Sequence, residues 1–328
     1  MSNVETRPLE QTVCDGPPAS TGTDTDAPDT ELLEPREVPL GGPRAMLVRR
    51  SLPNRHRRMV GAWCFADSFG PTDIAGADGM QVPPHPHIGL QTVSWLLEGE
   101  VWHQDSLGSR RMVRPGQLNL MTAGAGIAHS EQSPPGHSDT LYGVQLWIAQ
   151  PEQDRNGPAH FDHHTDLPTL VEEAGHVTVL MGELAGAASP ARAYTPLVGA
   201  DVELRPGGRL RLPLEADFEH AVLALGDPLT ADGRAVTAGA MRYLGRGRRE
   251  VLLESPTATR ALLVGGLPFE EHLVMWWNFV GRTHEDIERA REDWMAGRRF
   301  GKVTGYDGDS LPAPALPNVP LKPRGRTR

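Results

Sequence analysis

The chain has 328 residues, with 32 lysines and arginines against 42 aspartates and glutamates, for a formal net charge of −10. This balance argues against a protein whose main task is to coat nucleic-acid backbones. Only two cysteines are present, which excludes a disulfide framework, and no apolar run is long enough for a transmembrane helix.

The N-terminal segment holds much of the negative charge. Residues 1–43 carry nine acids and two arginines, whereas residues 44–150 carry eight acids and nine arginines. Residues 1–42 are rich in Thr, Asp, Glu and Pro without hydrophobic periodicity, so we expect a disordered acidic tail, with an interaction arm as the alternative. No basic segment followed by an apolar stretch opens the chain, so we expect no signal peptide and a cytoplasmic protein.

Short segments rich in β-forming residues follow, separated by turns. They lie at residues 45–50, 59–70, 81–100, 101–106, 117–123 and 141–149. Strands at hairpin spacing without intervening helices predict an antiparallel sandwich or barrel over residues 43–150. Gly124 and Gly126 lack the G-x-G-x-x-G spacing and precede no helical pattern, so they do not indicate a dinucleotide-binding loop.

After a polar linker at residues 150–168, the second half repeats this pattern of short β-forming segments separated by turns. We therefore predict a second β-domain over residues 151–306, which includes a helix that packs on a β-domain. Thr283 is the expected N-cap, and the apolar helix face comprises Ile287, Ala290 and Trp294. Residues 307–328 are predicted to form a loose, basic, proline-rich tail.

Two pairs of side chains carry the chemistry. His85 and His87 form an H-x-H pair, and His129 and Glu131 form an H-x-E pair. Residues i and i+2 of a strand point to the same face, so all four side chains converge if the two strands are neighbours. Three imidazoles and one carboxylate suit Fe, Mn, Ni, Cu or Zn and leave open coordination positions. Without thiolates, a structural zinc knot is not indicated.

The sequence blocks around these pairs resemble the pirin family of the cupin superfamily. The resemblance is carried by PHPHIGLQTVSWLLEGEVWHQDSLG at 84–108, RPGQLNLMTAGAGIAHSEQ at 114–132 and PFEEHLVMWWNFVGRTHEDIERAREDW at 268–294. It covers roughly residues 42–300. It implies an all-β bicupin, built from two cupin-type antiparallel β-barrels with a C-terminal helix.

The resemblance also implies a ligand set. His85, His87, His129 and Glu131 fall on the family's metal ligands in the N-terminal barrel, and the C-terminal barrel holds no metal. One divalent ion per chain is implied, Fe(II) first, with Mn, Ni, Cu, Co or Zn as alternatives. Gln91 departs from the glutamate common in pirins, which puts a role for an acid at that position in doubt.

Other residues have competing interpretations. His103 either lines the pocket and supports a ligand or is held in its strand for structural reasons. The favoured interpretation of His160, His163 and His164 is a solvated loop rather than a second metal site. His272 and His284 are expected to be structural or exposed, and Cys64 to be a small buried apolar residue.

The resemblance implies two kinds of role. One is quercetin 2,3-dioxygenase activity, in which a flavonol-like aromatic substrate and dioxygen react, carbon monoxide leaves, and Glu131 acts as general base. The other is a non-catalytic, iron- and redox-dependent regulatory protein that binds a transcription factor or metabolic enzyme. An arginine-rich segment at residues 49–58 could contact an acidic partner, although a solvated face or intramolecular pairing is favoured. A cupin isomerase or small-molecule binding protein is a third possibility. We expect a monomer that contacts neither nucleic acid nor membrane.

Overall fold

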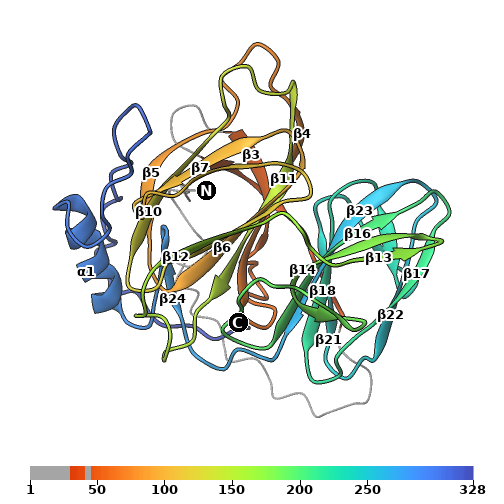
Figure 1. Ribbon diagram of the computed structural model, residues 1–328. Coiled ribbons are helices and arrows are strands. Elements are labelled where there is room, and N and C mark those ends of the chain that lie inside the picture. Colours follow the sequence, from red (N-terminus) through yellow and green to blue (C-terminus); the bar gives the residue numbers. More distant parts are fainter. Residues whose placement is uncertain (1–29, 41–45, 328) are drawn as a thin grey trace.

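The computed structural model describes residues 30–40 and 46–327 (Figure 1). Residues 1–29 and 41–42, which were expected to be disordered, lie outside the described residues. Within the described residues, the one α-helix is too short and too polar to cross a membrane.

Two antiparallel sheets form the N-terminal domain. The larger has the strand order β12-β9-β6-β11-β4-β3-β2, and the smaller has the order β5-β10-β7-β8. The strands of the larger sheet are β2 (Arg36–Leu40), β3 (Met46–Leu52), β4 (Trp63–Asp73), β6 (Leu90–Glu98), β9 (Leu118–Thr122), β11 (Thr140–Ala149) and β12 (His160–His164). Those of the smaller are β5 (Gln81–His87), β7 (Val101–Asp105), β8 (Arg110–Val113) and β10 (Ile127–Gln132).

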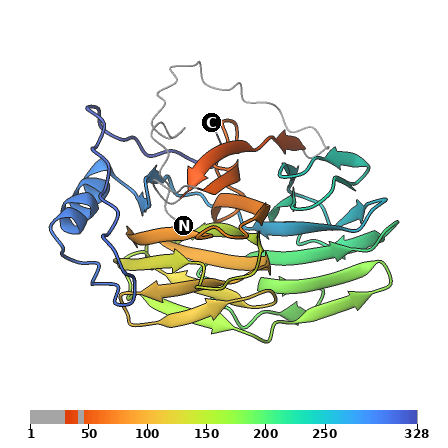
Figure 2. The same ribbon diagram turned by 90° about the horizontal axis from the view of Figure 1, so that it is seen from above.

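The C-terminal domain repeats this plan. Its larger sheet has the order β1-β21-β18-β23-β16-β14-β13, with β15 paired to β14, and its smaller sheet has the order β17-β22-β19-β20. The larger comprises β1 (Glu31–Leu33), β13 (Thr169–Glu172), β14 (Gly175–Leu184), β15 (Ala187–Ala188), β16 (Leu197–Leu204), β18 (Glu219–Ala224), β21 (Met241–Gly245) and β23 (Thr259–Gly266). The smaller comprises β17 (Arg209–Pro213), β19 (Leu229–Ala231), β20 (Arg234–Val236) and β22 (Glu250–Glu254). The prediction of two antiparallel β-domains is confirmed, and Figure 2 shows them side by side.

Alternate residues of the C-terminal strands pack into two different hydrophobic cores. On β18, Ala221 and Leu223 belong to the cluster shared with the N-terminal domain, whereas Val222 and Ala224 belong to the interior of the C-terminal domain. This follows from the two-residue period of a strand that is buried on both faces. Trp63 of β4 joins the domains, because its indole nitrogen donates to the carbonyls of Val198 and Gly265 at 3.2 and 3.1 Å.

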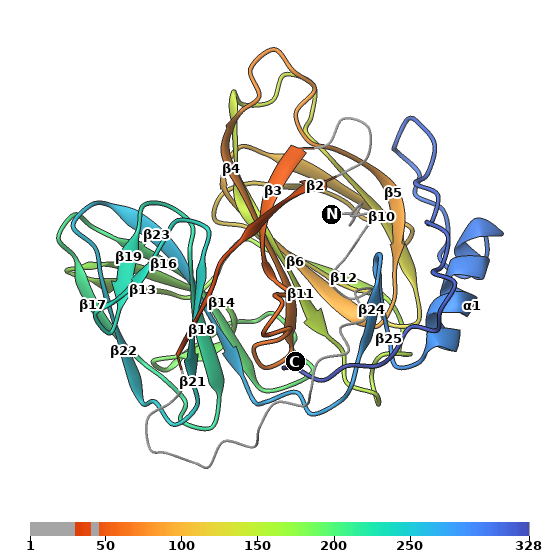
Figure 3. The same cartoon turned by 180° about the vertical axis from the view of Figure 1, so that it is seen from behind.

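The expectation of disorder is wrong for residues 31–40. The short strand β1 extends the C-terminal sheet beside β21, and β2 extends the N-terminal sheet beside β3 (Figure 3). The physical reason is burial of Leu33, Val38 and Leu40, which the acidic composition of the surrounding segment conceals. This segment therefore connects the edges of both domains.

The predicted polar linker contains strand β12, which pairs with β9 and so belongs to the N-terminal domain. The predicted helix is confirmed as α1 (His284–Met295), with Thr283 as N-cap and a capping box formed with Asp286. The helix packs beside the hairpin of β24 (Val274–Trp276) and β25 (Phe279–Gly281), in a cluster that includes Ile88 and Ala128. It therefore covers the N-terminal domain, although its sequence position is in the C-terminal half (Figure 1).

The C-terminal tail is not loose over residues 307–327. Leu321 is buried, and Arg324 exchanges two backbone hydrogen bonds of 2.9 Å with Leu273. Arg326 donates to the buried carboxylate of Glu219 at 2.7 Å. Individual anchors of this kind are spread through a proline-rich segment, where no periodic pattern reveals them.

Asp201 gives the fold a predicted pH dependence. This carboxyl on β16 is buried, and burial raises its pKa to about 6 from an ordinary value of 3.8, although Arg260 opposes the shift. A raised pKa means that the folded state binds the proton more tightly, so the stability contribution is complete below pH 4 and is lost as the pH rises through about 6. The loss is at most about 3 kcal/mol, since one pKa unit corresponds to about 1.4 kcal/mol.

We therefore expect Asp201→Asn to gain stability relative to the parent protein as the pH rises from 4 to 7. Urea unfolding of both proteins across this range measures the difference in unfolding free energy. A difference that does not change with pH would contradict the assignment.

Candidate metal centre

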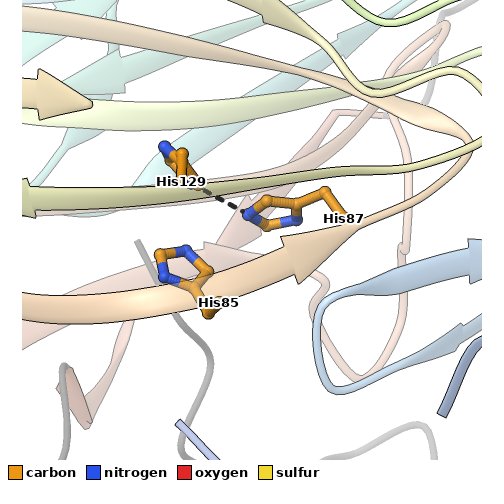
Figure 4. A group of neighbouring side chains, drawn as sticks. All are labelled: His85, His87 and His129. Atoms are coloured by element: carbon orange, nitrogen blue, oxygen red, sulfur yellow. Dashed lines mark hydrogen bonds between the residues drawn. The ribbon is translucent and has the colours of Figure 1, made fainter. Parts of the chain in front are cut away.

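The H-x-H and H-x-E pairs lie on neighbouring antiparallel strands. His85 of β5 is directly opposite His129 of β10 (Figure 4). In the same register, His87 is opposite Ile127. Each of the three imidazoles can offer one ring nitrogen such that these atoms all lie within 4.8 Å of one another. All three rings are fully buried. The predicted convergence of the three histidines is confirmed.

Backbone carbonyls hold two of the rings in one orientation. His85 Nδ1 lies 2.8 Å from the Pro83 carbonyl, and His87 Nδ1 lies 3.0 Å from the Asn278 carbonyl. Because a carbonyl only accepts, each Nδ1 carries the proton and each Nε2 keeps its lone pair. His85 Nε2 is buried without a hydrogen-bond partner, and His87 Nε2 is 3.1 Å from His129 Nε2.

The positions of these nitrogens are unfavourable without an ion between them and suit a bound metal ion. Two buried Nε2 lone pairs that face each other at 3.1 Å repel unless a proton or a cation lies between them. Burial is the largest cause that lowers the pKa of all three imidazoles well below their usual value, so the rings are neutral. Neutral imidazole is the form that binds a divalent metal.

Asn278 was not expected to take part in the site. It lies in the turn between β24 and β25, 191 residues after His87, and supplies a backbone carbonyl rather than its side chain. No side-chain motif could have revealed this contact. The apolar block at residues 272–281 therefore supports the site of the N-terminal domain.

Glu131, the fourth predicted ligand, lies on β10 with His129 and is buried. Its carboxylate accepts hydrogen bonds from Gln145 Nε2, at 3.1 and 3.4 Å, and from Ser94 Oγ at 3.3 Å. Among the described residues, the group of mutually close ligand atoms comprises the three imidazoles alone. Coordination by Glu131 therefore stays a prediction.

A polar row crosses the larger sheet beside this carboxylate. Asn119, Ser94, Gln145, Asp67 and Arg50 occupy equivalent register positions on five adjacent strands. At one end, Arg50 donates to both carboxylate oxygens of Asp67 at 2.7 and 2.8 Å, and neither side chain is exposed. Sequence reasoning missed this row, because its members come from strands far apart in the chain.

His103 supports the third imidazole. Its Nδ1 lies 3.4 Å from His129 Nδ1, and its Nε2 lies 3.0 Å from a carboxylate oxygen of Asp105. Burial raises the pKa of Asp105, but the hydrogen bond and charge of His103 together with the hydrogen bonds from Ser109 outweigh it, and the net shift is downward. An ionised Asp105 accepts the Nε2 proton of His103, which leaves Nδ1 to accept from His129. Of the two interpretations of His103, the structure favours the one in which it orients a ligand.

We therefore expect His103→Ala to weaken metal binding by about 10- to 100-fold, although all three metal-binding imidazoles remain. Competition with a chromophoric chelator measures the dissociation constant. His160→Ala is the matched control, because that histidine is exposed on β12. Equal metal affinity in His103→Ala and the parent protein would contradict a supporting role.

Gln91 does not face the metal centre. Its side-chain amide donates to Thr122 Oγ1 and to the Arg192 carbonyl, both at 3.0 Å. Thr92, the next residue on β6, is in register with Trp147. The Trp147 ring lies edge-on to the His87 ring, with the two ring centroids 5.3 Å apart. The alternation of the strand thus directs Gln91 toward the C-terminal half. The replacement of the common glutamate leaves the three histidines unaffected.

The remaining candidates lie elsewhere. The expected loop at residues 160–164 is wrong, since these histidines lie on β12, where His163 Nδ1 is 2.6 Å from Asn119 Oδ1. Cys64 is fully buried, as predicted, and Cys14 lies outside the described residues. His284 begins α1 and accepts from the Leu321 backbone at 3.1 Å, and His272 is also away from the cluster.

The arginine-rich segment at residues 49–58 is largely used inside the molecule. Arg50 pairs with Asp67, Arg57 pairs with Glu31, and Arg58 donates to the Thr327 carbonyl at 3.0 Å. Of the two favoured interpretations, intramolecular pairing therefore holds for these three residues. His56 and Arg55 are exposed.

Comparisons with known proteins agree with this geometry. Residues 45–148 match the family described as Pirin, and residues 199–301 match the Pirin C-terminal cupin domain. A relative from Pseudomonas aeruginosa is 42% identical over 97% of this chain and 98% of its own, and its name provisionally assigns it quercetin 2,3-dioxygenase activity. A pirin-like protein from Caulobacter vibrioides is 35% identical over 81% of this chain and 94% of its own.

A solved structure is also similar over most of the chain. It is described as a quercetin 2,3-dioxygenase from Acinetobacter baumannii, with a TM-score of 0.85 and 41% sequence identity. The match covers 89% of this chain and 98% of that chain. The agreement therefore extends through both β-domains.

Proposed function

Because this chain belongs to the pirin family of the cupin superfamily, we propose that it is a metal-dependent dioxygenase of the quercetin 2,3-dioxygenase type. The names of two relatives support an oxidoreductase of the dioxygenase class. The observation that carries the proposal is the convergence of three buried, neutral imidazoles beside a buried carboxylate. We propose a flavonol-like substrate and dioxygen as the reactants, with carbon monoxide as one product.

In this proposal His85, His87 and His129 hold a divalent metal ion, with Fe(II) as the first choice, and Glu131 is the fourth ligand. When bound, such an ion acts as a Lewis acid that lowers the pKa of a substrate hydroxyl and takes part in dioxygen chemistry. His103 and Asp105 fix the ring of His129, and the Pro83 and Asn278 carbonyls fix the other two rings.

Glu131 is proposed to accept the proton of the substrate hydroxyl next to the ring carbonyl. The hydrogen bonds from Ser94 and Gln145 orient its carboxylate, as a positioned general base requires. Phe65 and Trp147 stack with ring centroids 4.0 Å apart beside His87 and supply an apolar wall. Such a wall keeps bulk water from the reacting ring.

The test of this role is Glu131→Gln, which keeps the shape and removes the base. We expect quercetin turnover to fall by at least about 100-fold, the lower end of what a positioned general base contributes. Oxygen uptake and carbon monoxide release measure turnover, and metal content is measured on the same samples. Glu172→Gln, an exposed position on β13, is the control.

Full metal content with unchanged turnover in Glu131→Gln would overturn the base assignment. Loss of the metal together with turnover would support the proposed role of Glu131 as the fourth ligand, and turnover after the metal is restored then tests the base assignment. The regulatory alternative predicts partner capture that depends on the metal's oxidation state, a measurement that does not depend on quercetin turnover.

A further inference from the structure

The strand that carries two of the three imidazoles is irregular directly before His85. The register of β5 with β10 shifts there, so that Pro83 and Pro84 occupy an interval in which β10 has only Ser130. Proline has no N–H to donate to a ladder and is tolerated at such a bulge. The hydrogen bonds that hold this proline bulge can therefore be made only through its two carbonyls.

Both carbonyls are used outside the pairing of β5 with β10. The Pro83 carbonyl accepts from Nδ1 of His85 at 2.8 Å. The Pro84 carbonyl accepts from the backbone N–H of Leu311 at 2.9 Å. Because β5 is the last strand in the order of its sheet, its outer edge is open to a donor from another part of the chain. The C-terminal segment supplies that donor beside a predicted metal ligand.

Leu311 is held in turn by the helix. Its carbonyl accepts from the indole nitrogen of Trp294 on α1 at 2.8 Å, and both side chains pack in the cluster between α1 and the N-terminal domain. Figures 1 and 3 both show the C-terminal segment between α1 and the sheet of β5 and β10. Hydrogen bonds therefore connect α1 to Leu311 and Leu311 to the proline bulge.

The bulge controls the direction of the His85 ring. The Pro84 carbonyl and the His85 amide nitrogen belong to one planar peptide unit. The pyrrolidine rings fix φ of both prolines, so the rotation that remains is ψ, and the hydrogen bond from Leu311 restrains it at Pro84. The buried Nε2 of His85 must be directed toward the other two imidazoles to share a metal ion with them.

We propose that Leu311 is a positioning residue for the metal centre. Its backbone N–H, oriented by Trp294, holds the proline bulge so that His85 points at the position where a metal ion would be bound. The inference rests on the proposed metal site, but it does not depend on which reaction that site catalyses. It gives the C-terminal proline-rich segment a role in the chemistry of the N-terminal domain.

The experiment is a titration of the metal-free, full-length protein with Co(II), whose visible absorption spectrum reports the geometry of its ligands. Leu311→Pro removes the N–H from a segment that already contains Pro312 and Pro314. We expect Co(II) affinity to fall about tenfold, the upper end of what one hydrogen bond contributes, and the absorption bands to shift. Ala315→Pro, at an exposed position of the same segment, is the matched control and should keep the affinity and spectrum of the parent protein.

Trp294→Phe is the second variant, because it removes the indole donor and keeps an aromatic ring in the cluster. We expect Co(II) affinity to fall about threefold, and this variant decides the test if thermal unfolding shows that Leu311→Pro does not fold. Unchanged affinity and spectrum in either folded variant would overturn the proposal, as would an equal loss in Ala315→Pro. Because none of these readouts uses quercetin, a parent protein that binds Co(II) but lacks turnover would contradict the dioxygenase proposal alone.

Discussion

Replacing His129 with alanine is expected to lower metal affinity by more than about 100-fold, beyond the loss typical of residues that only support a ligand. His129 is the central ring of the site, because it faces His87 through Nε2 and His103 through Nδ1. The substitution therefore removes one metal-binding nitrogen and disconnects the Asp105–His103 pair from the others. Metal content after dialysis and the dissociation constant from chelator competition measure the effect.

His137→Ala is the control for this experiment. His137 is exposed on a loop and hydrogen-bonds to the carbonyls of Ser138 and Ala77, so its loss should not change metal affinity. Circular dichroism and thermal unfolding of His129→Ala distinguish a lost ligand from a lost fold. Undiminished metal affinity in a folded His129→Ala protein would show that the three histidines are not the metal site.

Replacing Asp67 with alanine is expected to destabilise the protein by about 3–5 kcal/mol, the range measured when one partner of a buried ion pair is removed. The carboxylate of Asp67 accepts two hydrogen bonds from Arg50, and both side chains are fully buried. The guanidinium carbon lies 4.2 Å from the centroid of the Phe65 ring, and the Arg50 side chain is not exposed. Urea unfolding monitored by tryptophan fluorescence gives the change in unfolding free energy.

The surface provides a comparison for this pair. Arg211 and Glu250 form an ion pair across β17 and β22 with more than half of each side chain exposed. Glu250→Ala should therefore change the unfolding free energy by less than about 1 kcal/mol. If Asp67→Ala destabilised the protein no more than Glu250→Ala does, the buried pair would not contribute to the fold as described.

The histidine cluster was predictable because it depends on two local rules. The spacing of His85 and His87, and of His129 and Glu131, places each pair on one face of a strand. Pairing of β5 with β10 then brings the pairs together, and the hairpin signals between them favour neighbouring strands. The helix was predictable for a similar reason, because its N-cap and apolar face lie within a few residues of one another.

The rest of the site depends on long-range register. Ser94, Gln145 and Asp67 look like isolated polar residues in apolar strands, and only their alignment across the sheet makes them a row. Asn278 contributes through its backbone, which no residue pattern records. Residues 31–40 and the C-terminal tail were misjudged because a few buried side chains, not composition, hold them in place.

The most direct test of the proposed function is metal analysis of the purified protein combined with an aerobic quercetin assay. We predict one divalent ion per chain, and consumption of dioxygen matched by release of carbon monoxide, both abolished by chelation and restored when the metal is returned. A protein that binds no metal, or that is fully loaded and turns over quercetin no faster than the free ion, would contradict this function.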